Sequence, residues 1–411
     1  MHLSIRTIIY CLFFIVPLSS CLEEADPASE SEKFIRFFDH GQFSSSFKAI
    51  DIIELPSGGY LVLAGRAIEV TPGQVSYQGV YLLKTDQYGN FVGDLNVEES
   101  YINALPGITE VDGKYYFICT STEGNYMAQL ASVDINLEGI SFSPLGLSHP
   151  GAVAPLKNIN KDFIVLSYNP ADKQSVVSIV STSGMVTRSA SYSIGAGNDL
   201  VDEKIHDHFA GTGRIFPFQV GEVSPGLYFF NGFYDYSLSL AFVNLNESDN
   251  KASSVIRTEY DDVGFSTVVP IGGNVFATSL FNQGDNFLYP RTTLATSSGE
   301  SSIEFEGAFK LPELAPYSPV KILRTQLNEK NVLVYGSNTK SKQIGLFFYD
   351  ETTGALLGNR YVGFSNPFEI GNVIKTLDGG LAIAGTTYIA GRFARVTIIK
   401  LSKDEVEKEV K

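Results

Sequence analysis

The chain has 411 residues, with 45 acidic and 30 basic side chains and a formal charge of −15 at pH 7. This acidic excess argues against a nucleic-acid-binding protein, because phosphate backbones require clustered Lys and Arg, and against electrostatic docking onto anionic lipid. The chain has 21 Tyr and 29 Phe but no Trp, which excludes repeat families whose motifs depend on tryptophan.

Residues 1–20 have the pattern of a secretory signal peptide. One charged residue, Arg6, precedes the apolar run 8–16, which is shorter than the roughly 20 apolar residues that span a bilayer. Leu-Ser-Ser then stands immediately before Cys21. This order resembles the lipobox of bacterial lipoproteins, which implies cleavage before Cys21, lipidation of that cysteine and attachment to the membrane through its acyl chains.

Residues 21–32 predict a solvated acidic tether behind the lipid anchor. Leu22 follows the cysteine where Asp would favour retention at the inner membrane. Glu23 and Glu24 resemble the export signal of surface lipoproteins in Bacteroidota. The resemblance therefore implies a lipoprotein anchored in the outer membrane, with the cell surface favoured over the periplasmic face.

A repeated motif occupies both ends of the following region. Residues 49–65 and 371–385 each predict a strand, a Gly-Gly hairpin turn and a second strand that ends in Ala-Gly, since such glycine pairs supply the positive φ of tight hairpins. Weaker copies lie between them, about 50 residues apart. The second strands of the copies are predicted to begin near Tyr60, Tyr115, Phe163, Leu227, Val275, Val332 and Leu381.

Third and fourth strands complete each copy, as at 80–86 with 91–92, or at 346–350 with 355–357. Four strands per copy in seven copies predict an all-β fold, a seven-bladed β-propeller over 33–402. The last copy lacks a fourth strand, and the strand-like segment 33–38 has no partner of its own. We therefore expect 33–38 to complete the last blade and close the ring, which would protect the sheet edges.

The blades resemble the Asp-Gly-Gly-Tyr…Ala-Gly propeller repeats of secreted bacterial proteins and Bacteroidota lipoproteins. That group is functionally mixed, so the resemblance implies a fold and a location outside the cytoplasm but identifies no substrate. Residues 403–411 are expected to form a charged C-terminal tail, which could include a short helix.

The longest gap between copies contains the only weak candidates for a metal site. Leu200, Val201, Ile205 and Phe209 predict a short amphipathic helix capped by Asn198 or Asp199.

In such a helix Asp202 and His206 lie one turn apart, whereas in a strand His206 and His208 share a face. Two ligands do not make a metal site, so a solvated covering loop remains the competing interpretation.

No nucleophile elbow, Walker loop or zinc-protease motif occurs. Acid pairs such as Asp261 with Asp262 are expected by chance among 45 acids. Cys119 lies in a strand-like run and predicts a buried, inert thiol, while His40 and His149 lie in predicted turns.

Two aromatic runs, 228–230 and 233–236, predict either core packing between blades or a ligand surface at the mouth of the ring. Three functions fit these observations. The leading hypothesis is a lipid-anchored binding module for a glycan, a peptide or an envelope protein, without a cofactor. The alternatives are a polysaccharide hydrolase or lyase, and a scaffold of an outer-membrane complex. Whether the chain is an enzyme stays uncertain, although the missing catalytic motifs favour the binding module.

Overall fold

The computed structural model describes residues 33–38, 45–71, 74–124, 126–195, 197, 199–211, 215–246, 250–258, 262–297, 299–389 and 393–410. These residues form an all-β structure with two helices, α3 (Asp199–Ala210) and α4 (Lys403–Glu407). No described helix is long and apolar enough to cross a membrane. The signal segment, Cys21, the acidic tether and His40 lie outside the described residues.

The strands form antiparallel units of four in chain order, which we number 1 to 7. Unit 1 contains β2 (Phe47–Glu54), β3 (Tyr60–Thr71), β4 (Gln74–Thr85) and β5 (Phe91–Asn96). Unit 2 contains β7 (Thr109–Val111), β8 (Lys114–Ser121), β9 (Met127–Asp134) and β10 (Ile140–Ser148). Unit 3 contains β11 (Pro150–Pro155), β12 (Phe163–Asn169), β13 (Gln174–Val180) and β14 (Val186–Ser193). Unit 4 contains β15 (Gln219–Ser224), β16 (Leu227–Tyr234), β17 (Ser237–Val243) and β18 (Ser254–Arg257).

The remaining units have the same order of strands. Unit 5 contains β19 (Val263–Gly272), β20 (Val275–Asn282), β21 (Asp285–Thr293) and β23 (Phe309–Lys310). Unit 6 contains β24 (Val320–Leu327), β25 (Lys330–Asn338), β26 (Ile344–Asp350) and β27 (Leu356–Val362). Unit 7 contains β28 (Phe368–Lys375), β29 (Leu381–Ile389), β30 (Phe393–Leu401) and, from the other end of the described chain, β1 (Phe34–Phe38).

The second strands begin where the repeat predicts them, within two residues in every unit. The glycine pairs explain why the end copies are so clear. Gly58 and Gly379 have φ of 84° and 88°, which side chains disfavour. A Cβ at Gly59 would lie 2.2 Å from the carbonyl oxygen of Thr85, so no side chain fits there.

The register corrects one detail of the repeat. Asp51 pairs with Leu63, and Asn372 pairs with Ala384. Asp51 and Asn372 are 321 residues apart, so they occupy equivalent positions, as do Leu63 and Ala384. The Ala-Gly pair that ends the second strand therefore lies one residue earlier in the last copy than in the first.

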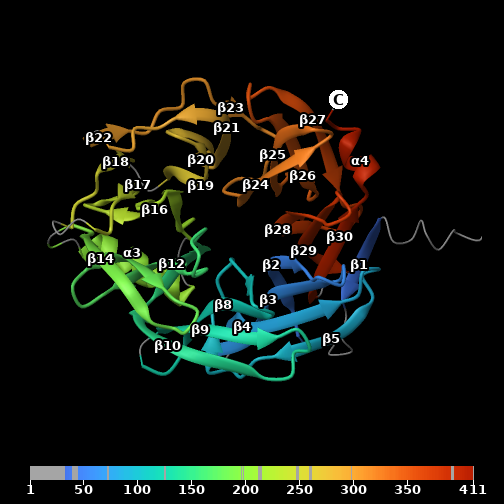
Figure 1. Ribbon diagram of the computed structural model, residues 1–411, viewed down its shortest axis with the longest axis horizontal. Coiled ribbons are helices and arrows are strands. Elements are labelled where there is room, and N and C mark those ends of the chain that lie inside the picture. Colours follow the sequence, from blue (N-terminus) through green and yellow to red (C-terminus); the bar gives the residue numbers. More distant parts are fainter. Residues whose placement is uncertain are drawn as a thin grey trace, which may run out of the picture.

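The units follow one another around a common centre, with β28 beside β2 (Figure 1). Seven apolar clusters each fill the space between two successive units, and one of them joins unit 7 to unit 1. The middle strands are therefore buried on both faces and read as continuous apolar runs, as in β12 and β26. Outer strands such as β14 are largely exposed.

The strand 33–38 pairs with the last unit, as the sequence predicts. β1 runs antiparallel to β30, with Phe34 opposite Lys400 and Phe38 opposite Val396. Phe34 also contacts the ring of Tyr60 in unit 1, at a centroid distance of 6.2 Å. The first described strand thus connects units 7 and 1.

Units 2, 4 and 5 depart from the regular pattern. In unit 2 the short β6 (Tyr101–Ile102) bridges β4 and β8, so units 1 and 2 share one nine-stranded sheet. In unit 5 the fourth strand has only two residues, and β22 (Gly299–Ser302) instead pairs with β18 of unit 4 in parallel. These departures explain the weak copies in the middle of the sequence.

The C-terminal residues after 402, predicted as a charged tail, pack against units 6 and 7. Ser402 caps α4 through a capping box with Glu405. Val406 and Val410 are fully buried in the cluster between units 6 and 7. Arg360 of β27 binds Glu405 at 2.9 Å, so the charges predicted as a tail fix the helix to the sheet.

Candidate functional site

A cavity of about 700 Å³ lies where the first strands of units 1, 4, 5 and 6 begin. We call it the central cavity. Its lining consists of Lys48, Asp262, Phe281 and the segments 215–218, 266–267 and 317–321. Pockets for small ligands commonly have about 300–1,000 Å³, so the central cavity has the capacity for a small molecule or for the end of a larger one.

Two lysines contribute the cationic groups of the central cavity. Lys48, on β2, is an exposed rim residue whose ammonium lies 3.7 Å from Glu369. Lys321, the second residue of β24, is partly buried, and its ammonium makes no hydrogen bond or ion pair with any residue that the structure describes. Desolvation lowers the pKa of Lys321, and the negative charge of Asp51 partly opposes this shift.

The inner strands that carry these groups are irregular. β19 has a bulge between Phe265 and Thr267, which places both Ser266 and Thr267 in the cavity lining. The Thr267 hydroxyl donates to the carbonyl of Val320 and so ties unit 5 to unit 6. The hydroxyl of Ser266 is buried and has no hydrogen-bond partner among the described residues.

An aromatic wall comes mainly from the segment that enters β15. The rings of Phe216 and Phe218 are nearly parallel, 24° apart in plane, with centroids at 5.9 Å. Phe216 is buried, and its ring meets Phe233 edge-on at 5.0 Å. Ile215 and Tyr317 are exposed at the rim. The central cavity therefore combines an apolar wall with two cationic side chains.

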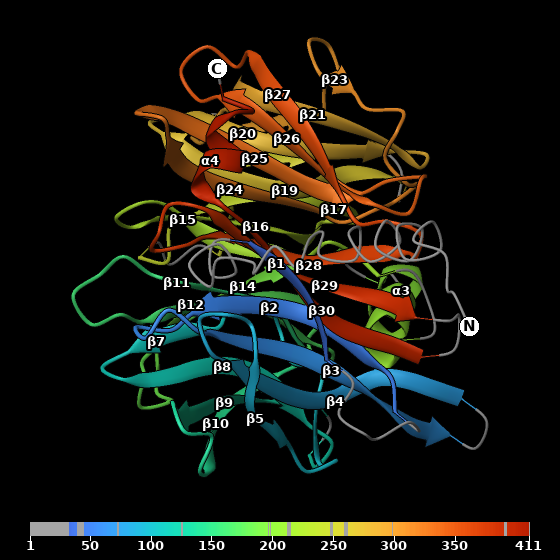
Figure 2. The ribbon, with the colours of Figure 1, turned by 90° about the vertical axis from the view of Figure 1, so that its right-hand side faces the viewer.

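The amphipathic helix predicted before this segment is α3, which lies at one side of the sheets in Figure 2. Val201 and Ile205 are buried, as predicted. Leu200 is 68% exposed, so its assignment to the apolar face is wrong. The proposed caps cannot be compared, because Asn198 and the side chain of Asp199 lie outside the described residues.

The weak metal candidates take separate roles. The hydroxyl of Tyr168 donates to Asp202, and the ammonium of Lys173 lies 3.7 Å from the same carboxyl group. Nδ1 of His208 accepts the backbone N–H of Phe216 at 3.0 Å, while His206 is exposed. No group of three metal-ligating side chains occurs among the described residues.

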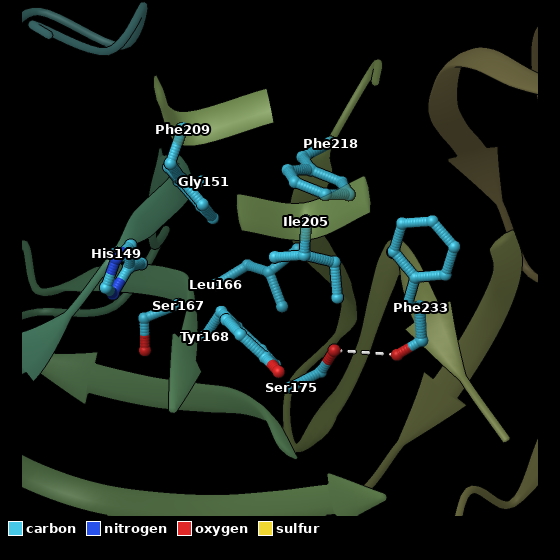
Figure 3. Close-up of a pocket in the computed structure, with 11 residues that line it drawn as sticks. His149, Gly151, Leu166, Ser167, Tyr168, Ser175, Ile205, Phe209, Phe218 and Phe233 are labelled. Atoms are coloured by element: carbon cyan, nitrogen blue, oxygen red, sulfur yellow. Dashed lines mark hydrogen bonds between the residues drawn. The ribbon is translucent and has the colours of Figure 1, made fainter. Parts of the chain in front are cut away.

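His149 lies beneath α3 in a small pocket of about 10 Å³ (Figure 3). The predicted turn is a buried junction between β10 and β11, with a φ of 47° at His149. Its ring packs against Tyr126 and Phe209, and its Nδ1 has no hydrogen-bond partner among the described residues. Burial lowers the pKa of His149, with a further contribution from His206 and an opposing one from Asp202.

The other sequence candidates mostly form core. Phe229, Phe230 and Phe233 are buried, which confirms the packing interpretation of the aromatic runs, whereas Tyr236 is exposed. Cys119 is buried, and desolvation raises the pKa of its thiol to about 12. This confirms the predicted burial of the thiol.

Sequence reasoning missed the central cavity. The lysines, the bulge residues and the segment 215–218 belong to no motif, and 273 residues separate Lys48 from Lys321 along the chain. One signal was available: each lysine is the second residue of a first strand and follows an apolar residue.

Comparisons with known proteins identify similar structures but no family. No protein-family model and no curated protein sequence matches the chain. The chain is similar to Raptor of Chaetomium thermophilum, with a TM-score of 0.50 and 10% identity, over 86% of this chain and 28% of that chain. It is also similar to a Trypanosoma rangeli sialidase in complex with 2,3-difluorosialic acid, with a TM-score of 0.46 and 9% identity, over 88% and 56%. The chain spans less than two thirds of either structure, and the likeness to Raptor concerns the all-β fold alone.

Proposed function

We propose that the protein is a lipid-anchored binding protein of the bacterial envelope, built as a closed seven-bladed β-propeller whose central cavity receives the ligand. The pairing of β1 with β30 and the apolar cluster between units 7 and 1 support the closed ring. The lipobox at Cys21 supports the anchor. The observation that carries the binding function is the central cavity, with its aromatic wall and its lysines.

The ligand-binding function is favoured over a polysaccharide hydrolase or lyase by the lining of the central cavity. Glycosidases generally need two carboxyl groups about 5–10 Å apart. Among the described lining residues, Asp262 is the one carboxylate. The lining thus suits recognition better than acid–base chemistry.

The position of binding is tested with a fluorophore on a single introduced thiol. Ile215→Cys places it on the rim, where the native side chain is 74% exposed. Ile159→Cys, in the turn between β11 and β12, is the control, because Ile159 is 97% exposed. Cys119 is buried and does not compete for the label.

Envelope glycans, peptides and small metabolites are then screened against both labelled proteins. Binding is expected to change the emission at position 215 and leave position 159 unchanged. Ligands that bind tightly without affecting position 215 would contradict the central cavity as the site.

The anchor is tested separately with Cys21→Ala. Wild-type cells are expected to incorporate labelled fatty acid into the protein and retain it in the outer membrane, and the variant to lose both properties. Protease added to intact cells then distinguishes the proposed surface location from the periplasmic face, since only surface protein is digested before lysis.

A further inference from the structure

The ammonium of Lys321 forms no ion pair with any residue that the structure describes. Its side chain lines the central cavity and is partly buried, and it makes no ion pair or hydrogen bond with any described residue. Charged groups removed from water are normally paired. The arrangement therefore leaves this ammonium available to a counter-charge from outside the chain.

Asp51, the carboxylate whose charge acts on Lys321, already has other partners. Asp51 is buried, and its Oδ1 accepts hydrogen bonds from the Ile52 N–H at 2.8 Å and from Nδ2 of Asn372 at 2.5 Å. Its Oδ2 accepts the N–H groups of Gly107 and Ile108 at 2.6 and 3.0 Å. Asp51 thus has its full set of donors without Lys321.

The surroundings of Lys321 are mostly apolar. Val320 and Phe216 are buried, Phe281 is also buried, and Pro217 and Phe218 complete this side of the lining. A phosphate or another dianion would need several donors in such a place. One ammonium beside aromatic rings instead matches a group with a single negative charge on an apolar body.

We propose that the central cavity binds an apolar group that carries one carboxylate, with the ammonium of Lys321 as its counter-charge. This inference rests on the proposed function and specifies its ligand class. The same chemistry has two sources, a free carboxylic acid and the C-terminal residue of a peptide. Binding of either one supplies the ion pair that Lys321 lacks.

The experiment compares acids with their neutral amides on the full chain extracted in mild detergent. The probes are 3-phenylpropionate, 3-phenylpropionamide, N-acetylphenylalanine as a peptide terminus, and galacturonate as a polar carboxylate. Dissociation constants are measured by NMR titration. The fluorophore at position 215 reports whether each probe occupies the central cavity.

Two lysine variants give the matched comparison. Lys321→Met keeps the aliphatic stem and removes the charge, and Lys48→Met removes the rim lysine that pairs with Glu369. We expect 3-phenylpropionate or N-acetylphenylalanine to bind at least about tenfold more tightly than the amide, which is the usual effect of a charge-assisted hydrogen bond. Lys321→Met should abolish this preference, and Lys48→Met should retain it. Thermal melting checks that both variants fold.

Three other outcomes would each overturn the inference, and each has a distinct reading. If acid and amide occupy the cavity equally, or if Lys321→Met keeps the preference, the carboxylate assignment is wrong and the binding function stands. If galacturonate binds better than the apolar acids, the ligand is an acidic sugar. If no probe changes the emission at position 215, the inference fails, while the screen with envelope glycans, peptides and small metabolites still decides the proposed function. Within a positive result, a preference for N-acetylphenylalanine over 3-phenylpropionate identifies a peptide terminus.

Discussion

The junction of units 7 and 1 and the wall of the central cavity in unit 5 both bury polar groups, but they differ in how many of those groups are hydrogen-bonded. At the junction, Asp51 accepts four hydrogen bonds and joins three segments of the chain. In the cavity wall, the hydroxyl group of Ser266 is buried without a partner among the described residues, and the ammonium of Lys321 in the same lining makes no ion pair with them.

On the proposed function, this difference separates polar groups that stabilise the fold from polar groups that face the ligand. A buried polar group costs free energy unless it is hydrogen-bonded. The junction follows this rule because it holds the two ends of the described chain together. The cavity wall departs from it, as binding sites often do when their groups are arranged for a ligand rather than for stability.

The largest expected effect is at the junction. Asp51→Ala leaves the N–H groups of Gly107, Ile108 and Ile52 and the amide of Asn372 without their acceptor, so we expect a loss of at least about 3 kcal/mol in the free energy of unfolding. Urea denaturation measures it. Glu98→Ala is the control, because that residue is exposed, and its effect should stay within about 0.5 kcal/mol. Equal losses in the two variants would show that the hydrogen bonds of Asp51 contribute no more to stability than an exposed side chain does.

A smaller loss is expected from the hairpin of unit 7. A Cβ at Gly380 would lie 2.2 Å from the carbonyl oxygen of Leu401, so Gly380→Ala must displace the end of β30, at about 1–3 kcal/mol. At Gly93 no atom lies within 4 Å of an added Cβ. Gly93→Ala should therefore be nearly neutral in the same denaturation experiment, and a comparable loss there would show that the close contact is unimportant.

In the cavity wall, we expect a substitution to increase the free energy of unfolding rather than to lower it. Lys321→Met removes a desolvated, unpaired charge from an apolar lining, so we expect a gain of about 0.5–2 kcal/mol in the free energy of unfolding. Differential scanning calorimetry would record a higher melting temperature. Lys114→Met, at an exposed site, should leave it unchanged. A destabilised Lys321→Met would mean that the lysine is structural.

The smallest expected effect is the contribution of His149 to the pH dependence of stability. The groups around its ring are Asp202, paired with Lys173, together with His206, Tyr168 and Tyr126. Burial lowers the pKa of His149 below its ordinary value of 6.5, so the unfolded chain binds this proton more readily than the folded chain. The contribution of His149 to stability is complete above pH 6.5 and is lost as the pH falls towards the lowered pKa.

His149→Asn tests this contribution, since Asn tolerates the positive φ at this position. The urea midpoints of wild type and variant are compared at pH 7.5 and pH 5.5. The variant should lose less stability on acidification than the wild type, and Lys114→Met, at an exposed site, should behave like the wild type. Identical pH responses of His149→Asn and wild type would contradict the prediction.

Much of the architecture could be predicted because it is local. Glycine pairs locate the hairpins, and apolar runs locate the buried middle strands, so the second strand of every unit begins within two residues of its predicted position. The pairing of β1 with β30 could also be predicted, because one strand and one vacant edge were left over. The fourth strands of units 4 and 5 could not, since β22 joins the neighbouring unit through a pairing that no local pattern encodes.

The sequence by itself determined the strands, the hairpins and the helix α3, because steric limits at glycine and the period of apolar residues act within a few residues. Tertiary structure decided the rest. It buried His149 and Val410, exposed Leu200, and brought Lys48 and Lys321 to one cavity from distant strands. Contacts between groups far apart in the chain depend on how the units pack on one another. The periodicity of the sequence specifies local structure and does not specify this packing.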